Sequence, residues 1–355
     1  MRIAFFIILF FFFVANNVLA QPGTVISGEI LDSLKNPIPF ASVFLSNTTI
    51  GTSASSEGRF KITVPENGVY ELAVTCIGYK SYKKSIQVNG SELNFSITLF
   101  PNYKVLHDVV VTAKDKYRKR NLAMFRRIFF GSDWNSSLCE VVNPEDLRLI
   151  FDRGSDVLVG YSVKPLIIKN AALGYMIKYD LVDFRYMPNT EKYQFSGNPF
   201  FQDLEGTPEE LKKWRSNRLS AYYGSRMHFL RSLYNKKLYH EGFSVYEFKP
   251  VDVNQAFNNE KVLNLTDLCL AEEKDNVAIY YPKKIEINFS RINNGIVEGS
   301  NDEYIVYTSM VSFTRPISVY ANGYFWDGYS VTWEGRMSEQ RMANTLPYDF
   351  QPNKR

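Results

Sequence analysis

Hydrophobic and polar residues alternate along the first third of the chain. The stretch 59–64 reads RFKITV, the stretch 70–76 reads YELAVTC and the stretch 94–99 reads NFSITL. A period of two is typical of a strand with one buried face, so Cys76 is expected in the core. Turn-forming clusters separate these runs at intervals of roughly ten residues. We therefore predict a small antiparallel β-sandwich over residues 22–112.

From residue 147 onwards the runs are longer and predict a second sheet. Strands are expected over 147–151, 157–169 and 175–184, and further strands over 278–289 and 303–320. Asn322-Gly323 suits a tight hairpin turn. Residues 132–355 are therefore predicted to form an α+β domain, and the whole chain to be mainly β.

A long helix is predicted over residues 207–239. Thr207 is a suitable N-cap, Pro208 suits the first helical position, and Glu210 stands three residues after the cap. Gly224 marks a kink within the helix. We expect the helix to pack on the second sheet through Leu211, Trp214, Phe229 and Leu233, and to leave Lys212, Lys213, Lys236 and Lys237 in water.

A second helix is expected between the two predicted domains, within a linker of residues 113–131. Its apolar residues recur at helical spacing and Gly131 stops it. Its other side is basic, with Lys114, Lys116, Arg118, Lys119, Arg120, Arg126 and Arg127. A solvated face is the ordinary role of such a run, and contact of residues 114–127 with anionic phospholipid or lipopolysaccharide is the alternative.

The first 20 residues have the pattern of a cleavable signal peptide. Arg2 precedes an uncharged segment, and the small-residue pattern ends at Ala20. The apolar core of about 13 residues is shorter than the ~20 that a spanning helix needs. Cleavage between Ala20 and Gln21 is expected, and Gln21 in place of a cysteine argues against a lipoprotein. The exported chain should reside in the periplasm or at the outer membrane.

Charge and cysteine content exclude several classes of protein. The formal net charge is only +4, which does not favour a nucleic-acid partner. Cys76, Cys139 and Cys269 can make at most one disulfide, and whether any two pair is left open. His107, His228 and His240 lack the spacing of zinc ligands. We therefore expect neither a metal nor another cofactor.

Five short motifs in the first domain carry a resemblance to a known family. They are ISGEI at 26–30, PIPFASV at 37–43, GT at 51–52, GRF at 58–60 and CIGY at 76–79. The region resembles the carboxypeptidase-like regulatory domain of Bacteroidetes envelope proteins. The resemblance implies a transthyretin-like (prealbumin-like) sandwich without catalytic residues of its own. Many members carry an aspartate where Ser55 stands, so a loop calcium site is not carried over.

Two further stretches resemble parts of envelope proteins. Residues 106–113 look like the segment before the plug of TonB-dependent receptors, where it pairs with TonB as an added strand. We expect an ordinary last strand there and no TonB contact. The region after residue 132 resembles the uncharacterised C-terminal part of other Bacteroidetes proteins that bear the regulatory domain.

Candidate chemistry in the second domain is sparse. No nucleophile elbow or phosphate-binding loop occurs in the sequence, and a pairing of Cys139 or Cys269 with His228 has no support. A glycosidase needs a pair of acidic residues, and the candidates are Asp180, Asp183, Glu241 and Asp327. We expect these carboxylates to be ordinary surface residues.

One polar group in the long helix is a candidate ligand site. Helical spacing places Arg218, Tyr222 and Ser225 on one face, with His228 beside them; packing between domains is the alternative. We predict an exported, non-catalytic envelope module that binds a protein or a glycan and is accessory to nutrient uptake at the outer membrane. The alternative is a hydrolase of unknown type with its site in the C-terminal domain.

Overall fold

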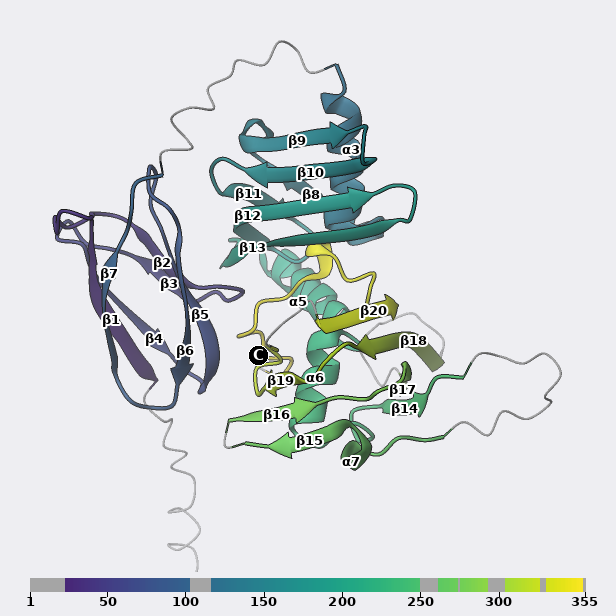
Figure 1. Ribbon diagram of the computed structural model, residues 1–355. Coiled ribbons are helices and arrows are strands. Elements are labelled where there is room, and N and C mark those ends of the chain that lie inside the picture. The colour runs from purple at the N-terminus through teal and green to yellow at the C-terminus, as the bar shows by residue number, and fades with distance from the viewer. Residues whose placement is uncertain are drawn as a thin grey trace, which may run out of the picture.

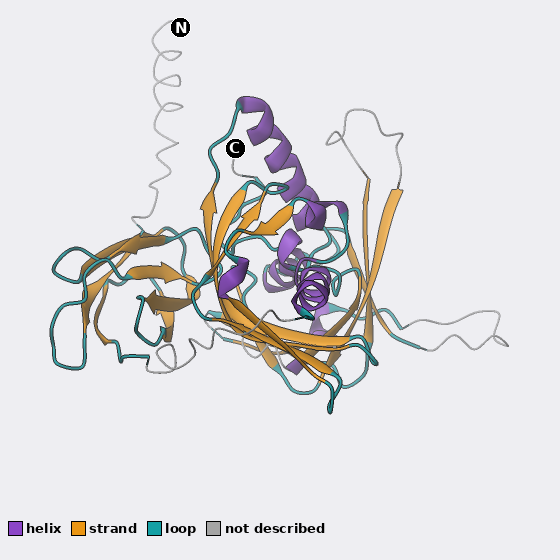
Figure 2. Cartoon of the chain, turned by 90° about the horizontal axis from the view of Figure 1, so that it is seen from above, coloured by secondary structure: helices purple, strands orange, loops and turns teal. Residues whose placement is uncertain are grey.

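The computed structural model describes residues 23–102, 116–249, 261–273, 275–292, 304–325 and 330–353. The signal peptide, the segment 106–113, His107 and Asp327 lie outside the described residues. The chain is mainly β, as predicted, and the N-terminal sandwich stands beside the rest of the molecule in two views (Figures 1 and 2). Among the described helices, none has the length and apolar character to cross a bilayer.

Seven strands form the sandwich, here defined as residues 23–102. They are β1 (Thr24–Leu31), β2 (Ser42–Leu45), β3 (Gly51–Ser53), β4 (Arg59–Val64), β5 (Gly68–Thr75), β6 (Tyr82–Val88) and β7 (Leu93–Thr98). One sheet has the order β4-β1-β7 and the other β3-β2-β5-β6. The alternation of β4 is confirmed, because Phe60, Ile62 and Val64 are buried and the residues between them are exposed.

The sandwich differs from the prediction in one pairing and one residue. β1 and β7 run parallel, whereas the other paired strands of the sandwich are antiparallel. A Cβ on Gly28 would lie 2.1 Å from the carbonyl oxygen of Phe95, so a glycine permits this close pairing. Cys76 is half-buried beside the core, not within it, and burial raises the pKa of its thiol.

A six-stranded sheet and a helix form the first half of the C-terminal region. The elements are α3 (Arg118–Phe130), α4 (Trp134–Ser137), β8 (Cys139–Val141), β9 (Leu147–Asp152), β10 (Val157–Ser162), β11 (Leu166–Asn170), β12 (Tyr175–Met187) and β13 (Lys192–Asp203), with a 3-10 turn at Pro144–Asp146. β12 is central: it pairs with β10 and β11 along one edge and with β13 along the other.

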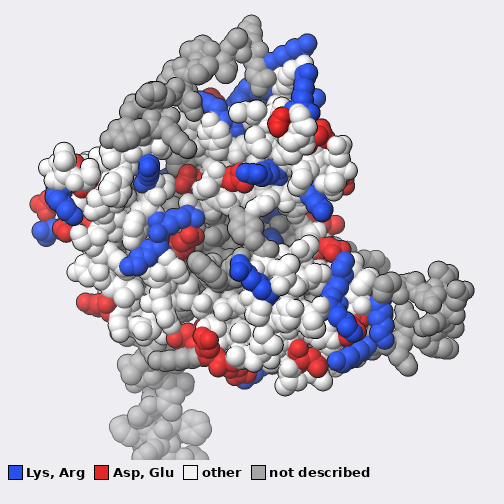
Figure 3. All heavy atoms as spheres, viewed as in Figure 1, with Lys and Arg blue, Asp and Glu red and all other residues white. Residues whose placement is uncertain are grey.

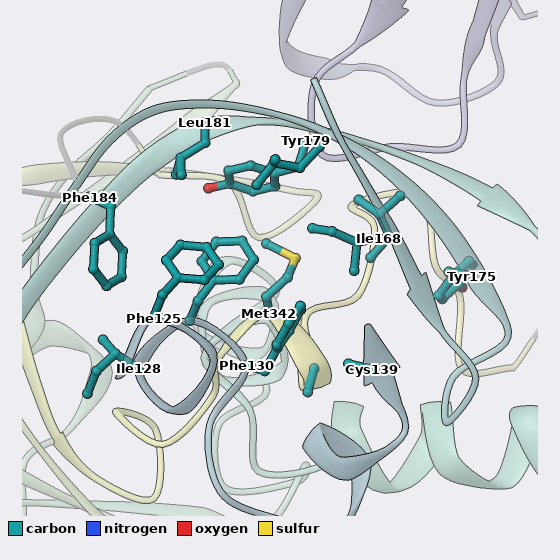
Figure 4. Close-up of a cluster of buried hydrophobic side chains, with 14 of the residues drawn as sticks. Phe125, Ile128, Phe130, Cys139, Ile168, Tyr175, Tyr179, Leu181, Phe184 and Met342 are labelled. Atoms are coloured by element: carbon teal, nitrogen blue, oxygen red, sulfur yellow. The ribbon is translucent and has the colours of Figure 1, made fainter. Parts of the chain in front are cut away.

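The helix α3 belongs to the core of this sheet and does not stand between two domains as a linker. Phe125 and Phe129 are buried, and Phe125 packs 4.9 Å from Phe184 of β12 between ring centroids. Figure 4 shows Phe125, Ile128 and Phe130 pointing towards side chains of the sheet. The apolar face seen in the sequence was correctly identified, but periodicity alone could not show which sheet it covers.

Two smaller sheets form the second half of the C-terminal region. The elements are β14 (Phe243–Glu247), α7 (Leu265–Leu268), β15 (Cys269–Glu272), β16 (Asn276–Ile279), β17 (Ile285–Ile292), β18 (Tyr304–Phe313), β19 (Ile317–Tyr320) and β20 (Val331–Gly335), with a 3-10 turn at Met342–Asn344. The sheet orders are β14-β17-β18-β20 and β15-β16-β19. A turn at Asn322-Gly323 follows β19, as predicted, with Gly323 at φ +82°.

Two helices replace the single long helix that was predicted. α5 (Pro208–Tyr222) begins with the predicted capping box of Thr207 and Glu210, and α6 (Arg226–Tyr234) starts at a new N-cap, Ser225. Gly224 has φ +74°, which an α-helix cannot include, so the kink is a complete break. α6 packs beside β19, and Figure 2 shows helices enclosed between strands.

The predicted packing of the two helices is correct in part. Trp214 is 7% exposed and donates a hydrogen bond of 3.0 Å from Nε1 to the carbonyl oxygen of Ala171. Phe229 and Leu233 are buried in the core of the second half. Leu211 is 51% exposed and was wrongly assigned to the core. All four predicted lysines are exposed, namely Lys212, Lys213, Lys236 and Lys237.

Candidate functional site

The loop 46–49 of the sandwich docks on the edge strand β13. The main-chain N–H of Asn47 donates to the carbonyl oxygen of Pro199 at 2.7 Å, and the N–H of Phe201 donates to that of Thr48 at 3.0 Å. The rings of Phe44 and Phe200 lie 5.1 Å apart. Because β13 is the edge of its sheet, these bonds satisfy main-chain groups that an edge leaves unpaired.

The last segment of the chain, residues 345–353, lies against the same loop; we call it the tail. The N–H of Tyr348 donates to the carbonyl oxygen of Asn47 at 2.6 Å. The carboxylate of Asp349 accepts a 2.9 Å hydrogen bond from the N–H of Thr49 and a second, short one from its hydroxyl. The tail therefore joins the sandwich to the C-terminal region.

A buried arginine fixes the tail on α6. Arg231 is 6% exposed. Its guanidinium donates to the carbonyl oxygens of Asn322, Phe350 and Tyr348 at 3.0, 2.8 and 2.9 Å. Carbonyl dipoles thus stabilise this buried cation, and each of these hydrogen bonds also holds a segment that contacts the sandwich.

The structure brings together three of the four candidate residues predicted from sequence. Tyr222 is buried, with its ring 4.8 Å from that of His228. Ser225 caps α6 by accepting from the N–H of His228 at 3.0 Å. The Nδ1 atom of His228 accepts from the N–H of Gly224, and Nε2 lies 3.3 Å from Oε2 of Glu241.

Arg218 lies apart from these three residues. Its guanidinium stacks 3.8 Å above the ring of Tyr175 and donates to the carbonyl oxygens of Leu173 and Gly174 and to the carboxylate of Asp203. These contacts hold the turn between β11 and β12 against α5. Helical spacing from the sequence was misleading in two ways. The break at Gly224 places Ser225 and His228 on a second helix, and the guanidinium of Arg218, although on the same helix as Tyr222, is held by Tyr175 and Asp203.

A hollow of about 350 Å³ opens beside His228. Its lining includes Glu241, Lys237 and Ser232. The hydroxyl of Ser232 donates to the main-chain oxygen of His228 at 2.7 Å, so it is engaged in the helix. Neither Cys139 nor Cys269 belongs to the described lining, and burial raises the pKa of both thiols.

A second hollow of about 300 Å³ lies where the sandwich, β13, α6 and the tail meet; we call it the junction hollow. The sandwich contributes Asn47, and β13 contributes Phe195, Ser196 and Pro199. The remaining lining is Tyr179, Gly197, Ala221, Ser225, Arg226, Met227, Leu230, Gly323, Phe325, Gln340, Met342, Asn344, Thr345, Leu346 and Tyr348. Sequence reasoning did not find this site, because its walls come from segments far apart in the chain.

The junction hollow carries a positive charge. Arg226, the first residue of α6, donates from Nη2 to the carbonyl oxygen of Gln340 at 3.0 Å. Burial lowers the pKa of its guanidinium. None of the described lining residues is an aspartate or a glutamate.

Metal-binding chemistry has no candidate in the part of the chain that the structure describes. There, no three histidine, cysteine or acidic side chains come together. The hydroxyl of Ser55 accepts from the N–H groups of Glu57 and Arg59 at 3.2 Å, which closes a local turn.

Three arginines of α3, Arg118, Arg126 and Arg127, bind other parts of the protein, whereas Lys119 and Arg120 are exposed. Arg118 donates to the carbonyl oxygens of Pro144 and Leu147, and Arg126 to that of Cys139. Arg127 donates to the hydroxyl of Tyr186 at 2.8 Å. On the face shown in Figure 3, basic and acidic side chains are interspersed. Contact of residues 114–127 with lipid remains a prediction.

Several solved structures share a local or weak likeness with this chain. The cohesin–X-dockerin complex of Acetivibrio cellulolyticus aligns at 24% identity over 22% of this chain and 58% of that chain, with a TM-score of 0.20. The 3-chlorocatechol 1,2-dioxygenase of Rhodococcus opacus 1CP aligns at 12% identity over 24% and 63%, with a TM-score of 0.19. The present chain therefore matches less than two thirds of either protein.

A longer alignment is equally weak. A candidate carbohydrate-binding protein from Bacteroides uniformis aligns at 9% identity over 81% of this chain and 98% of that chain, with a TM-score of 0.20. No curated protein matches the sequence.

The family comparison is specific to the sandwich. The family model of the CarboxypepD_reg-like domain matches residues 26–111, and the described part of that range forms a β-sandwich of two sheets. The resemblance inferred from the five motifs is therefore confirmed. The N-terminal sandwich of this chain is a CarboxypepD_reg-like domain.

Proposed function

We propose that this chain is an exported, non-catalytic binding module of the cell envelope, with a glycan as its ligand. The observation that carries the proposal is the junction hollow, because the CarboxypepD_reg-like domain and the C-terminal region both contribute to its wall. A site built at the meeting of two parts of a fold is a common place for a ligand. The signal-peptide pattern of residues 1–20 supports export.

The composition of the hollow suits a sugar. Tyr179, Phe195 and Tyr348 offer aromatic surface, while Asn47 and Ser196 offer an amide and a hydroxyl. Sugars present both C–H faces and hydroxyl groups, which match such a mixture. The volume of about 300 Å³ lies at the lower end of the range for small-molecule sites.

Retention of glycans by the purified chain tests this proposal. Glycans released from the outer membrane of producing cells are passed over the immobilised chain, and the retained fraction is analysed by mass spectrometry. Binding with unchanged glycan masses is expected. Shortened glycans would show catalysis, and failure to retain any glycan would contradict the binding role.

The hydrolase alternative has one specific observation in its favour, the pairing of His228 with Glu241 at 3.3 Å beside a hollow. A histidine oriented by a carboxylate is the arrangement of a general base. The Nδ1 atom of His228 accepts from the N–H of Gly224, so that hydrogen bond has to break before the ring can take a proton. If the retained glycans are shortened, His228→Asn should abolish the cleavage. If they are not, the pair serves packing around Tyr222.

A further inference from the structure

Arg226 places a cation inside the junction hollow. The hollow has no acidic residue in its described lining. Among the described residues, the guanidinium makes one hydrogen bond, from Nη2 to the carbonyl oxygen of Gln340. A guanidinium has five donor hydrogens in a planar fork, so most of its donor capacity is left for a ligand.

The main chain around Arg226 adds to this positive character. Arg226 opens α6, a helix of nine residues with no acidic residue in its first turn. The N-terminus of a helix carries a partial positive charge. Met227, in the same first turn, also lines the hollow, so helix end and guanidinium lie on the same wall.

The other walls restrict the kind of anion. Tyr179 and Phe195 are aromatic, Met342 and Leu346 are apolar, and Ser196 and Asn47 are polar. A bare inorganic anion would use only the cationic wall. A ligand that uses all walls needs an anionic group, hydroxyl groups and a compact apolar face on one small ring.

We infer that the junction hollow recognises a sugar acid, whose carboxylate binds the guanidinium of Arg226 and whose ring lies between Phe195 and the tail. This inference rests on the proposed glycan-binding function and names the class of glycan. Arginine and carboxylate form two parallel hydrogen bonds, which fix orientation as well as charge. The neutral sugar of the same shape lacks this contact.

Calorimetric titration of the purified full chain tests the inference. The probes are a galacturonate oligomer, the galactose oligomer of equal length, and inorganic phosphate. We expect the galacturonate oligomer to bind at least about tenfold more tightly than the neutral one, as is typical for a charge-assisted hydrogen bond. Arg226→Gln should remove that preference, and Arg226→Lys should keep part of it.

Two further variants separate binding from folding. Arg59→Gln changes an exposed arginine of the sandwich and should leave the affinity unchanged. Ser196→Phe fills the hollow without altering its charge and should abolish binding even if Arg226→Gln proves unstable in thermal unfolding.

The possible outcomes are distinct. Equal affinity for the acidic and neutral oligomers, wild-type affinity in Arg226→Gln, or binding of phosphate in place of the galacturonate oligomer would each overturn the inference. If the chain retains only neutral envelope glycans, the sugar-acid inference fails and the proposed function stands. If the chain retains no envelope glycan but binds the galacturonate oligomer through Arg226, the sugar-acid site stands, and the envelope origin of its ligand is the part of the proposed function that fails.

Discussion

Single residues fix the contacts between helices and sheets in this protein. Trp214 shows how: its indole is buried, hydrogen-bonds to Ala171 and lies against Gly174. A Cβ on Gly174 would come within 2.2 Å of that indole. The packing of α5 against the turn between β11 and β12 therefore depends on the side chain of Trp214.

Loss of this side chain should be costly. Trp214→Ala is expected to lower the free energy of unfolding by about 3–5 kcal/mol, because a large cavity forms and Ala171 loses its hydrogen-bond donor. Lys212→Gln, on the exposed side of α5, should stay within ~0.5 kcal/mol. Denaturant midpoints of both variants check this, and equal midpoints would show that α5 does not depend on the indole.

A polar group at the end of β14 makes stability depend on pH. Glu247 accepts hydrogen bonds from Lys283 at 2.6 Å and from Tyr281 at 2.5 Å. These bonds, that of Lys283 first, hold the pKa of Glu247 below its ordinary value of 4.5. The bond to Glu247, followed by burial, raises the pKa of Tyr281 to about 12.

Acid should therefore weaken the fold through Glu247. Its folded-state pKa is lower than its unfolded-state pKa, so its contribution is present above about pH 4.5 and is lost as pH falls through the folded pKa. Urea midpoints measured from about pH 3 to pH 7 should show a shallower acid slope in Glu247→Gln. Glu57→Gln, at an exposed site, should keep the wild-type slope. The same slope in both variants would contradict the assignment.

At the scale of elements, a helix or strand feature could be predicted when the residues that determine it lie close together in the sequence. The strand 59–64 and the capping box of Thr207 were predicted because a stretch of at most six consecutive residues determines each of them. The break at Gly224 was foreseen only as a kink, since the sequence cannot show that a second helix begins at Ser225. The exposure of Leu211 was missed because helical spacing shows which residues share a face, but not how much of the first turn other elements cover.

The break between α5 and α6 requires a glycine. Gly224 has φ +74°, and a Cβ there would lie 2.8 Å from the ring of Phe289. Gly78 has φ +87° with nothing within 4 Å of such a Cβ. Gly78→Ala should therefore cost about 1–2 kcal/mol from backbone strain alone.

Gly224→Ala should cost more than Gly78→Ala, by a further ~1–3 kcal/mol for overpacking. Chemical unfolding of both variants gives the comparison. If Gly224→Ala proved the milder change, the contact of the break with Phe289 would be disproved.

At the scale of the whole molecule, the sandwich is attached at several separate points. Besides the loop 46–49, the hydroxyl of Ser81 donates to Asp180 at 2.9 Å, and the amide of Asn322 donates to the carbonyl oxygen of Val69 at 3.2 Å. The amide of Gln351 reaches Glu66. These partners are main-chain atoms or isolated polar side chains, which leave no pattern in the sequence. For this reason neither the docking nor the junction hollow could be predicted.

The tail should be needed for this attachment. Asp349→Ala removes both hydrogen bonds to Thr49, each worth about 1.5–3 kcal/mol when one partner is charged. The sandwich should then separate part of the time, and small-angle X-ray scattering should record a larger radius of gyration. Asp183→Asn, whose carboxylate pairs with Arg185 on the surface, is the control. An unchanged radius in Asp349→Ala would mean that the tail does not hold the sandwich.

Hydrogen–deuterium exchange with and without the glycans released from the outer membrane tests most directly whether the junction is the binding surface. Residues 46–48, 196–199, 225–227 and 345–348 line the hollow or are next in sequence to a lining residue. They come from the sandwich, β13, α6 and the tail, and a ligand in the hollow should slow exchange in all four segments together. Protection confined to other segments, or no change on addition of the glycans, would contradict the account.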